Sequence, residues 1–151
     1  MHSPAQLFTQ VQLSKERKNM LVSTQTEVLA DRFGDAQAIR ILANAGYDAF
    51  DLSLFRMYVD PDYPMNSPDF RTYAAGLRAV ADEAGIVCNQ AHAPFPSSTD
   101  DPEETELIFK MIVRAMEAAA IVGAKIIVVH PCQHMRYPGN EKALKEINLA
   151  F

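Results

Sequence analysis

Two histidines in this chain of 151 residues each lie just before a proline, at the end of an apolar run. The sequences are His92-Ala93-Pro94 and His130-Pro131. A neutral imidazole can bind a metal, hydrogen-bond a hydroxyl group or move a proton near neutral pH. The nearby proline removes a backbone donor and favours extended geometry before it, which suits a strand that ends at a fixed side chain. We therefore expect His92 and His130 to end two strands and to bind substrate there, or else to hydrogen-bond to loop carbonyls.

A third candidate is Asp51, which lies in an alternating run over 48–54. Because successive side chains of a strand point to opposite faces, this run predicts one apolar face beneath helices and one smaller, more polar face that holds Asp51. Its carboxylate would bind a substrate hydroxyl or a metal, or else accept from loop backbone. Because every second residue of a strand lies on the same face, Gln90 and Cys88 are expected on the face of His92. In this placement Cys88 fills the interior of the sheet rather than acting as a nucleophile.

The elements that must position these residues repeat along the chain. Three helix-ending glycines, Gly46, Gly85 and Gly123, lie 39 and 38 residues apart, and each precedes an apolar run. A constant period of this length is typical of one structural unit that is repeated. The pattern predicts strands over 20–24, 48–54, 86–92 and 125–130. It predicts helices from about 35 to 45, 67 to 84 and 101 to 122, and a last helix from near 140.

The sequence thus predicts an α/β fold with four parallel βα units, β-α-β-α-β-α-β-α, with right-handed crossovers. Such a run builds either half of a (β/α)8 TIM barrel or an open flavodoxin-like sheet. Helix starts are marked at Ser67-Pro68 and at Asp101-Pro102, where Glu104 has the spacing of a capping box. The long segment 55–66 is expected to be a functional loop.

Composition narrows the function classes. The formal net charge is −5, and an acidic chain lacks the clustered cations that nucleic-acid binding requires. No apolar run has the length of a membrane span, and the start lacks the order of a secretory signal. The two cysteines, Cys88 and Cys132, have no metal-type spacing and suggest no disulfide framework. We expect a cytoplasmic protein with a polar N-terminal extension over 1–18 and one domain over 19–151.

Several short segments, in order and at near-equal spacing, resemble a known family. They are Gly46–Leu52, Ala91–Phe95, Val128–Pro131 and Glu146–Phe151. They are similar to the second, third and fourth strands, and to the following helix, of the xylose-isomerase-like TIM barrels, the sugar phosphate isomerase/epimerase superfamily. The resemblance runs from roughly residue 19 to the end. It implies the N-terminal half of a (β/α)8 barrel.

The resemblance also implies a function. It is that of a metal-dependent sugar or sugar-phosphate isomerase/epimerase, with His92, His130 and Asp51 near the substrate at the carboxyl ends of the strands. A divalent metal (Mn, Mg or Zn) is expected for the complete barrel, held mainly by strands of the second half, so the chain alone is expected to be inactive. The implied partners are a small sugar or sugar phosphate and either a second copy of the chain or a missing C-terminal half.

Two alternatives stay open at this point. An endonuclease-IV-like zinc phosphodiesterase would use His92 and His130 as metal ligands. A non-catalytic half-barrel would act only by assembling with itself or with a partner. In the loop after the fourth strand, His134 and Arg136 could also reach the carboxyl ends of the strands, where Arg136 could bind a phosphate, or both could be solvated loop residues.

Overall fold

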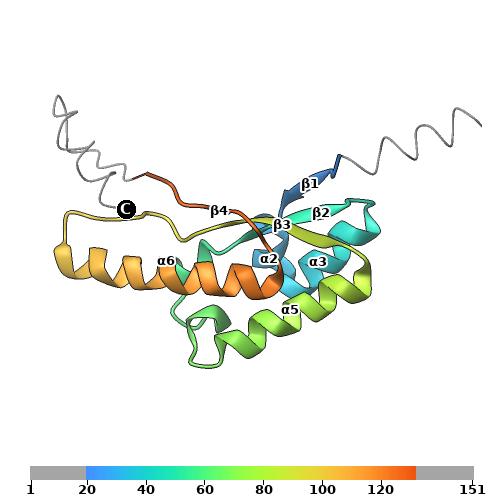
Figure 1. The fold of residues 1–151 in the computed structure, drawn as a ribbon. Helices are drawn as coiled ribbons and strands as arrows, with labels where there is room; N and C mark the ends of the chain where they lie inside the picture. The colour runs from blue at the N-terminus through green and yellow to red at the C-terminus, as the bar shows by residue number, and fades with distance from the viewer. Residues whose placement is uncertain (1–19, 132–151) are drawn as a thin grey trace, which may run out of the picture.

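The computed structural model describes residues 20–131, which form a four-stranded parallel sheet in the order β1-β2-β3-β4 (Figure 1). The strands are β1 (Ser23–Gln25), β2 (Ala49–Ser53), β3 (Val87–His92) and β4 (Ile127–Val128). Each strand is hydrogen-bonded to the next in the sequence, as expected where every crossover carries a helix. Four parallel strands that alternate with helices form a partial TIM barrel, which confirms the predicted fold class.

The helices all lie on one side of the sheet (Figure 1). They are α2 (Glu27–Phe33), α3 (Asp35–Asn44), α4 (Arg56–Val59), the 3-10 helix η2 (Pro64–Asn66), α5 (Phe70–Ala84) and α6 (Pro102–Val122). Phe50 and Leu52 of β2, and Leu54 directly after it, face the helices and are fully buried in the main apolar core. This confirms the predicted alternation along β2. The opposite face of the sheet is here called the inner face. At the amino ends of the strands, the apolar side chains of Leu21, Val87 and Ile126 are exposed.

Several predicted boundaries are wrong. The first strand begins at Ser23 rather than at Met20, and β4 is limited to Ile127–Val128 rather than 125–130. The sequence reading also missed α2, which is short and ends at Gly34, directly before α3. The predicted loop 55–66 contains two helical turns, α4 and η2, which bury Met57 and Met65.

Helix starts agree with the prediction at one place and differ at another. Asp101 is the N-cap of α6, and its side chain accepts from the backbone N–H groups of Glu103 and Glu104. The side chain of Glu104 does not return to the cap. It accepts from the hydroxyl groups of Tyr58, at 2.9 Å, and Thr99, at 2.8 Å. The predicted start of α5 at Ser67 is also wrong, because η2 and a turn precede the helix, which begins at Phe70.

The alternation of β3 is interrupted by a β-bulge. Phe50 pairs with Cys88 but Asp51 pairs with Gln90, so that Asn89 is an extra residue in β3. Cys88 therefore lies on the helix side with Phe50, in the apolar core, whereas Gln90 shares the inner face with Asp51. The predicted placement of Cys88 on the face of His92 is thus wrong.

Within residues 20–131, no helix is both long enough and apolar enough to cross a membrane. The predicted N-terminal extension 1–18 and the predicted helix from about 140 lie outside the described residues.

Candidate functional site

Asp51 and His92 form a hydrogen-bonded pair on the inner face, at the carboxyl ends of β2 and β3. The Nδ1 atom of His92 lies 3.0 Å from Oδ1 and 2.9 Å from Oδ2 of Asp51. The register explains the contact, because Ser53 pairs with His92 and Asp51 therefore lies one inner-face position below it. Both side chains are mostly buried, with 11% of Asp51 and 18% of His92 exposed. The carboxylate therefore contacts the edge of the imidazole that bears Nδ1 and leaves Nε2 to other partners.

Gln90 contacts the same carboxylate. Its Nε2 group donates to Oδ2 of Asp51 at 2.7 Å, so a neutral amide and an imidazole share one acidic group. The sequence reading placed Gln90 on the face of His92 but gave it no role. The signal that could have found it is the 39-residue spacing from Asp51, which equals the distance between the first two helix-ending glycines.

His130 lies beside this pair, two residues beyond the end of β4. The centroids of the His92 and His130 rings are 5.5 Å apart. Phe55 lies near both imidazoles, with centroid distances of 5.8 Å to His92 and 6.1 Å to His130. Phe95 meets the His130 ring edge to face at 5.5 Å and is 40% exposed. The structure thus brings together the three residues that the sequence singled out, beside two phenyl rings.

Backbone hydrogen bonds fix the strand ends that carry these side chains. The N–H of Leu54 donates to the carbonyl of His92 at 3.0 Å, and the N–H of Ala93 donates to the carbonyl of Val128 at 2.9 Å. On the other side, the N–H of Ser53 donates to the buried hydroxyl of Thr26 at 3.0 Å. Because these backbone groups are paired within the sheet, the side chains of Asp51 and His92 are held on rigid elements, as a binding site requires.

The described residues do not by themselves form a metal centre. Within 20–131 no group of three or more His, Cys, Asp and Glu side chains could hold a metal ion. The carboxylate of Asp51 is already taken by Gln90 and by Nδ1 of His92. The two imidazoles remain as nitrogen donors, and a divalent ion usually takes four or more ligands. The other loop candidates, His134 and Arg136, lie outside the described residues.

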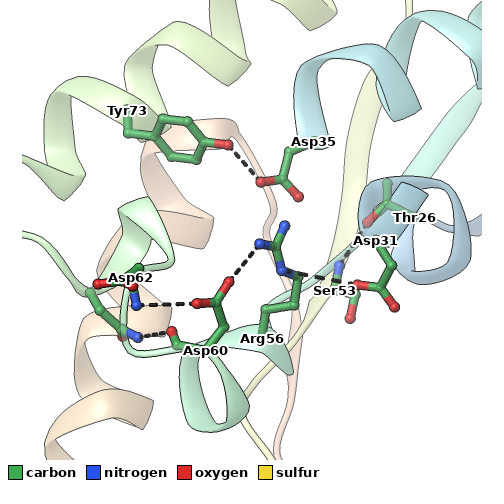
Figure 2. Close-up of polar contacts among 9 residues, drawn as sticks. Thr26, Asp31, Asp35, Ser53, Arg56, Asp60, Asp62 and Tyr73 are labelled. Atoms are coloured by element: carbon green, nitrogen blue, oxygen red, sulfur yellow. Dashed lines mark hydrogen bonds and ion pairs between the residues drawn. The ribbon is translucent and has the colours of Figure 1, made fainter. Parts of the chain in front are cut away.

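A second polar cluster lies among the helices and the loop that follows β2 (Figure 2). Arg56 pairs with Asp60 at 2.7 Å and lies 4.0 Å from Asp31, and its guanidinium lies over the Tyr63 ring. The hydrogen bond to Asp60 is the main reason that the pKa of Arg56 is raised. Nearby, Tyr73 donates to the buried carboxylate of Asp35 at 2.7 Å. This cluster fixes the segment between β2 and α5 and takes no part in the Asp51–His92 pair.

Cys88 is not a nucleophile candidate in the structure. Its side chain is buried in the core, and desolvation raises the pKa of the thiol from 9.0 to about 12. A thiol in such surroundings is protonated at neutral pH and therefore unreactive.

Comparison with known proteins gives a family and two similar folds. A family model described as xylose isomerase-like TIM barrel matches residues 39–149. The comparison with curated proteins found no match to this sequence. Among solved structures, a D-psicose 3-epimerase determined in the presence of D-fructose is similar, with a TM-score of 0.60 and 13% identity. A 3-keto-D-glucoside 4-epimerase from E. coli has a TM-score of 0.56 and 20% identity.

The two structural matches cover most of this chain but only part of the other proteins. Each covers 87% of this chain, and they cover 45% and 49% of the epimerase chains. The chain therefore spans about half the length of the solved structures it matches. At these identities the likeness concerns the fold.

Proposed function

The chain belongs to the xylose isomerase-like TIM barrel family, and we propose that it supplies part of the active site of a sugar or sugar-phosphate isomerase or epimerase. The observation that carries the proposal is the Asp51–His92 pair with the His130 ring beside it, at the carboxyl ends of parallel strands. Barrels of this kind place their chemistry at that end. The two similar solved structures are sugar epimerases, which favours a small polyhydroxylated substrate.

The role of the two histidines is to position the substrate. Asp51 accepts from Nδ1 of His92, so Nε2 of the neutral ring is the atom that accepts from a substrate hydroxyl. His130, one ring away, contacts a neighbouring oxygen of the same substrate. The half-buried Phe55 and the exposed part of Phe95 restrict water around the imidazoles, which strengthens polar contacts there. The carboxylates that move the proton at the carbon next to the carbonyl come from outside the described residues.

We keep the divalent metal (Mn, Mg or Zn) as part of the proposal, with most of its ligands outside residues 20–131. A bound metal would polarise substrate oxygens. Because His92 and His130 are assigned to the substrate, residues 20–131 supply no complete set of metal ligands, and binding of the metal by this chain alone should be weak. Isothermal titration with Mn²⁺ and Zn²⁺ measures this directly. Tight stoichiometric binding of either metal to the chain alone would contradict the proposal that most of the metal ligands lie outside residues 20–131.

The assembly proposal rests on the inner face and the sheet edges. In the described part of the chain, β1 and β4 each pair with one strand, and Leu21, Val87 and Ile126 are at least half exposed beside them. Unpaired strand edges next to exposed apolar side chains favour association with another sheet. We propose that a second half-barrel, either another copy or a C-terminal half, covers this face. Light scattering of the chain alone should give a mass above the 16.8 kDa of a monomer, and a cooperatively melting monomer would contradict it.

The activity test uses the chain together with a separately supplied C-terminal half-barrel of the same family. Epimerisation of D-fructose and D-psicose is followed by NMR with Mn²⁺ or Mg²⁺ present. We expect activity only in the mixture, and a loss of about 100-fold in His92→Gln and in His130→Gln, the size of effect that a misplaced substrate gives. His2→Gln, in the predicted extension, is the control and should retain full activity.

A folded, reconstituted barrel that converts no common ketose would overturn the proposal. Cleavage of abasic DNA by the same barrel loaded with zinc would instead support the phosphodiesterase alternative. Full activity of His92→Gln would remove the positioning role while leaving the reaction class intact.

A further inference from the structure

The β-bulge in β3 places two consecutive amide side chains on one face. Below the bulge, Ala49 pairs with Val87 and Phe50 with Cys88; above it, Asp51 pairs with Gln90 and Leu52 with Ala91. Asn89 is the extra residue, and its Nδ2 group donates to the hydroxyl of Ser23 on β1 at 3.1 Å. Since Ser23 pairs with Ala49 on the inner face, the Asn89 side chain crosses β2 over the small Ala49. Both Asn89 and Gln90 therefore point to the inner face.

The two amides have different partners. Asn89 reaches down and across to β1, whereas Gln90 reaches the neighbouring position on β2, where Asp51 lies. A strand without the extra residue would offer one inner-face side chain at this level, and it could not make both contacts. Bulges beside functional sites often serve to aim a side chain in this way.

Gln90 holds the acidic group that orients His92. A carboxylate on a single χ2 torsion can rotate, and the Gln90 donor at 2.7 Å on Oδ2 fixes that rotation. Both oxygens then stay within hydrogen-bond distance of Nδ1 of His92, at 3.0 Å and 2.9 Å. Groups one step removed from a functional imidazole commonly set its tautomer in this manner.

We propose that Gln90 is a positioning residue, which locks the Asp51 carboxylate so that neutral His92 carries its proton on Nδ1 and keeps Nε2 as an acceptor for the substrate. The use of Nε2 by a substrate rests on the proposed function. The tautomer itself does not, and it is a property of the chain without substrate, metal or partner.

The test measures the tautomer of His92 by long-range proton–nitrogen NMR on the full chain. The chain has four histidines, so the spectrum is simple, and His92→Gln identifies the signal. Spectra are recorded over a series of pH values, and the tautomer is read from the signals of the neutral ring. We expect the wild-type signal to be that of the Nδ1–H form. In Gln90→Met, which keeps the length but removes the donor, the ratio of Nδ1–H to Nε2–H should fall about tenfold, as for the loss of one charge-assisted hydrogen bond.

Asn89→Met is the control, since it removes the amide donor of the other bulge residue with the same replacement, although it also lengthens that side chain. It should leave the tautomer of His92 unchanged. If either methionine variant fails to give a folded circular dichroism spectrum, Gln90→Ala and Asn89→Ala replace the pair. A wild-type His92 in the Nε2–H form, an unchanged tautomer in the Gln90 variants, or an equal loss in both positions would each overturn the proposal. An inactive reconstituted barrel with the expected tautomer pattern would overturn the proposed function and leave this inference standing.

Discussion

The hydroxyl groups of Tyr73 and Tyr63 lie near the same buried carboxylate but should contribute very differently to stability. Asp35 begins α3 and is 1% exposed, and one of its oxygens accepts from the Tyr73 hydroxyl at 2.7 Å (Figure 2). Its other oxygen, Oδ1, is buried without a hydrogen-bond partner among the described residues. The hydroxyl of Tyr63 is likewise buried without a hydrogen-bond partner within residues 20–131. Burial first, and then the nearby Asp35, raise the pKa of this phenol. Replacing each tyrosine by phenylalanine therefore separates a bonded hydroxyl from an unbonded one.

The expected magnitude follows from what each change leaves behind. Tyr73→Phe removes the hydroxyl that donates to Asp35, and the carboxylate is too deeply buried for water to replace it. Hydrogen bonds to charged groups contribute about 1.5–3 kcal/mol, so the free energy of unfolding should fall by about 2 kcal/mol. Tyr63→Phe removes a buried polar group that makes no hydrogen bond. Its effect on the free energy of unfolding should lie between zero and a gain of about 1 kcal/mol.

The assay is urea unfolding of the chain, followed by circular dichroism at one fixed protein concentration, because association shifts apparent stability. The pKa values give a second readout. Burial first, and then the Asp35 hydrogen bond and charge, raise the pKa of Tyr73. The Tyr73 phenol should therefore stay protonated at pH values at which an exposed tyrosine ionises. An equal loss of stability in Tyr63→Phe and Tyr73→Phe would refute the assignment of the hydrogen bond to Tyr73 alone.

Three further predictions concern single residues of the core and the helix ends. Burial raises the pKa of the Cys88 thiol to about 12, whereas the thiol of the unfolded chain ionises near 9.0. The stabilisation by the neutral thiol should therefore be complete below pH 9 and be lost as the pH rises toward 12. Cys88→Val should reduce this loss of stability, measured by urea unfolding at alkaline pH. Gly123 ends α6 at φ 110°, and a Cβ there would lie 2.5 Å from the Arg78 guanidinium. Gly123→Ala should therefore lower the free energy of unfolding by about 1–2 kcal/mol. Gly76 lies inside α5 with open space around it, so Gly76→Ala should raise the free energy of unfolding by about 0.5–1 kcal/mol in the same assay. Asp101→Ala removes the cap bonds to the start of α6 and should lower the free energy of unfolding by about 1 kcal/mol, while Asp101→Asn should retain most of it.

The units that repeat were predictable, and the pieces between them were not. Each predicted helix that ends at a glycine exists, because Gly85 and Gly123 supply the left-handed residue that a helix end accepts most easily. The helix α2 was missed because its seven residues are too few for a clear apolar period, and only Ala30 is buried. The turns α4 and η2 were missed for a related reason. Their buried residues, Met57 and Met65, are fixed by contacts with the core rather than by a local pattern.

That the three candidate residues lie together could be predicted from the sequence, and their contacts could not. Strand ends and parallel pairing suffice to bring Asp51, His92 and His130 to the same end of the sheet. The hydrogen bond between Asp51 and Nδ1 of His92 depends on register between β2 and β3, which no local pattern specifies. Simple alternation along β3 correctly predicts that Gln90 shares the face of His92. It fails for Cys88, because the bulge lies between Cys88 and Gln90.

Successive side chains of a strand point to opposite faces. A shift of one residue in the pairing therefore changes the face of a side chain, whereas a shift of two residues keeps the face. The chain shows one shift of each kind. Residues of β2 and β3 that pair below the bulge are 38 apart, and those above it are 39 apart. This shift of one residue adds Asn89 to the inner face without moving Cys88 out of the core. Between β3 and β4 the paired residues His92 and Val128 are 36 apart, two fewer than the 38-residue spacing of the glycines that precede these strands. A shift of two residues keeps each side chain on its face but moves it along the strand. Val128 is therefore the partner of His92, and His130 lies at the next inner-face position beyond it. His92 and His130 are 38 residues apart, so the repeat alone would pair them directly. The observed register instead raises His130 by one inner-face position, and the centroids of the two rings are still only 5.5 Å apart.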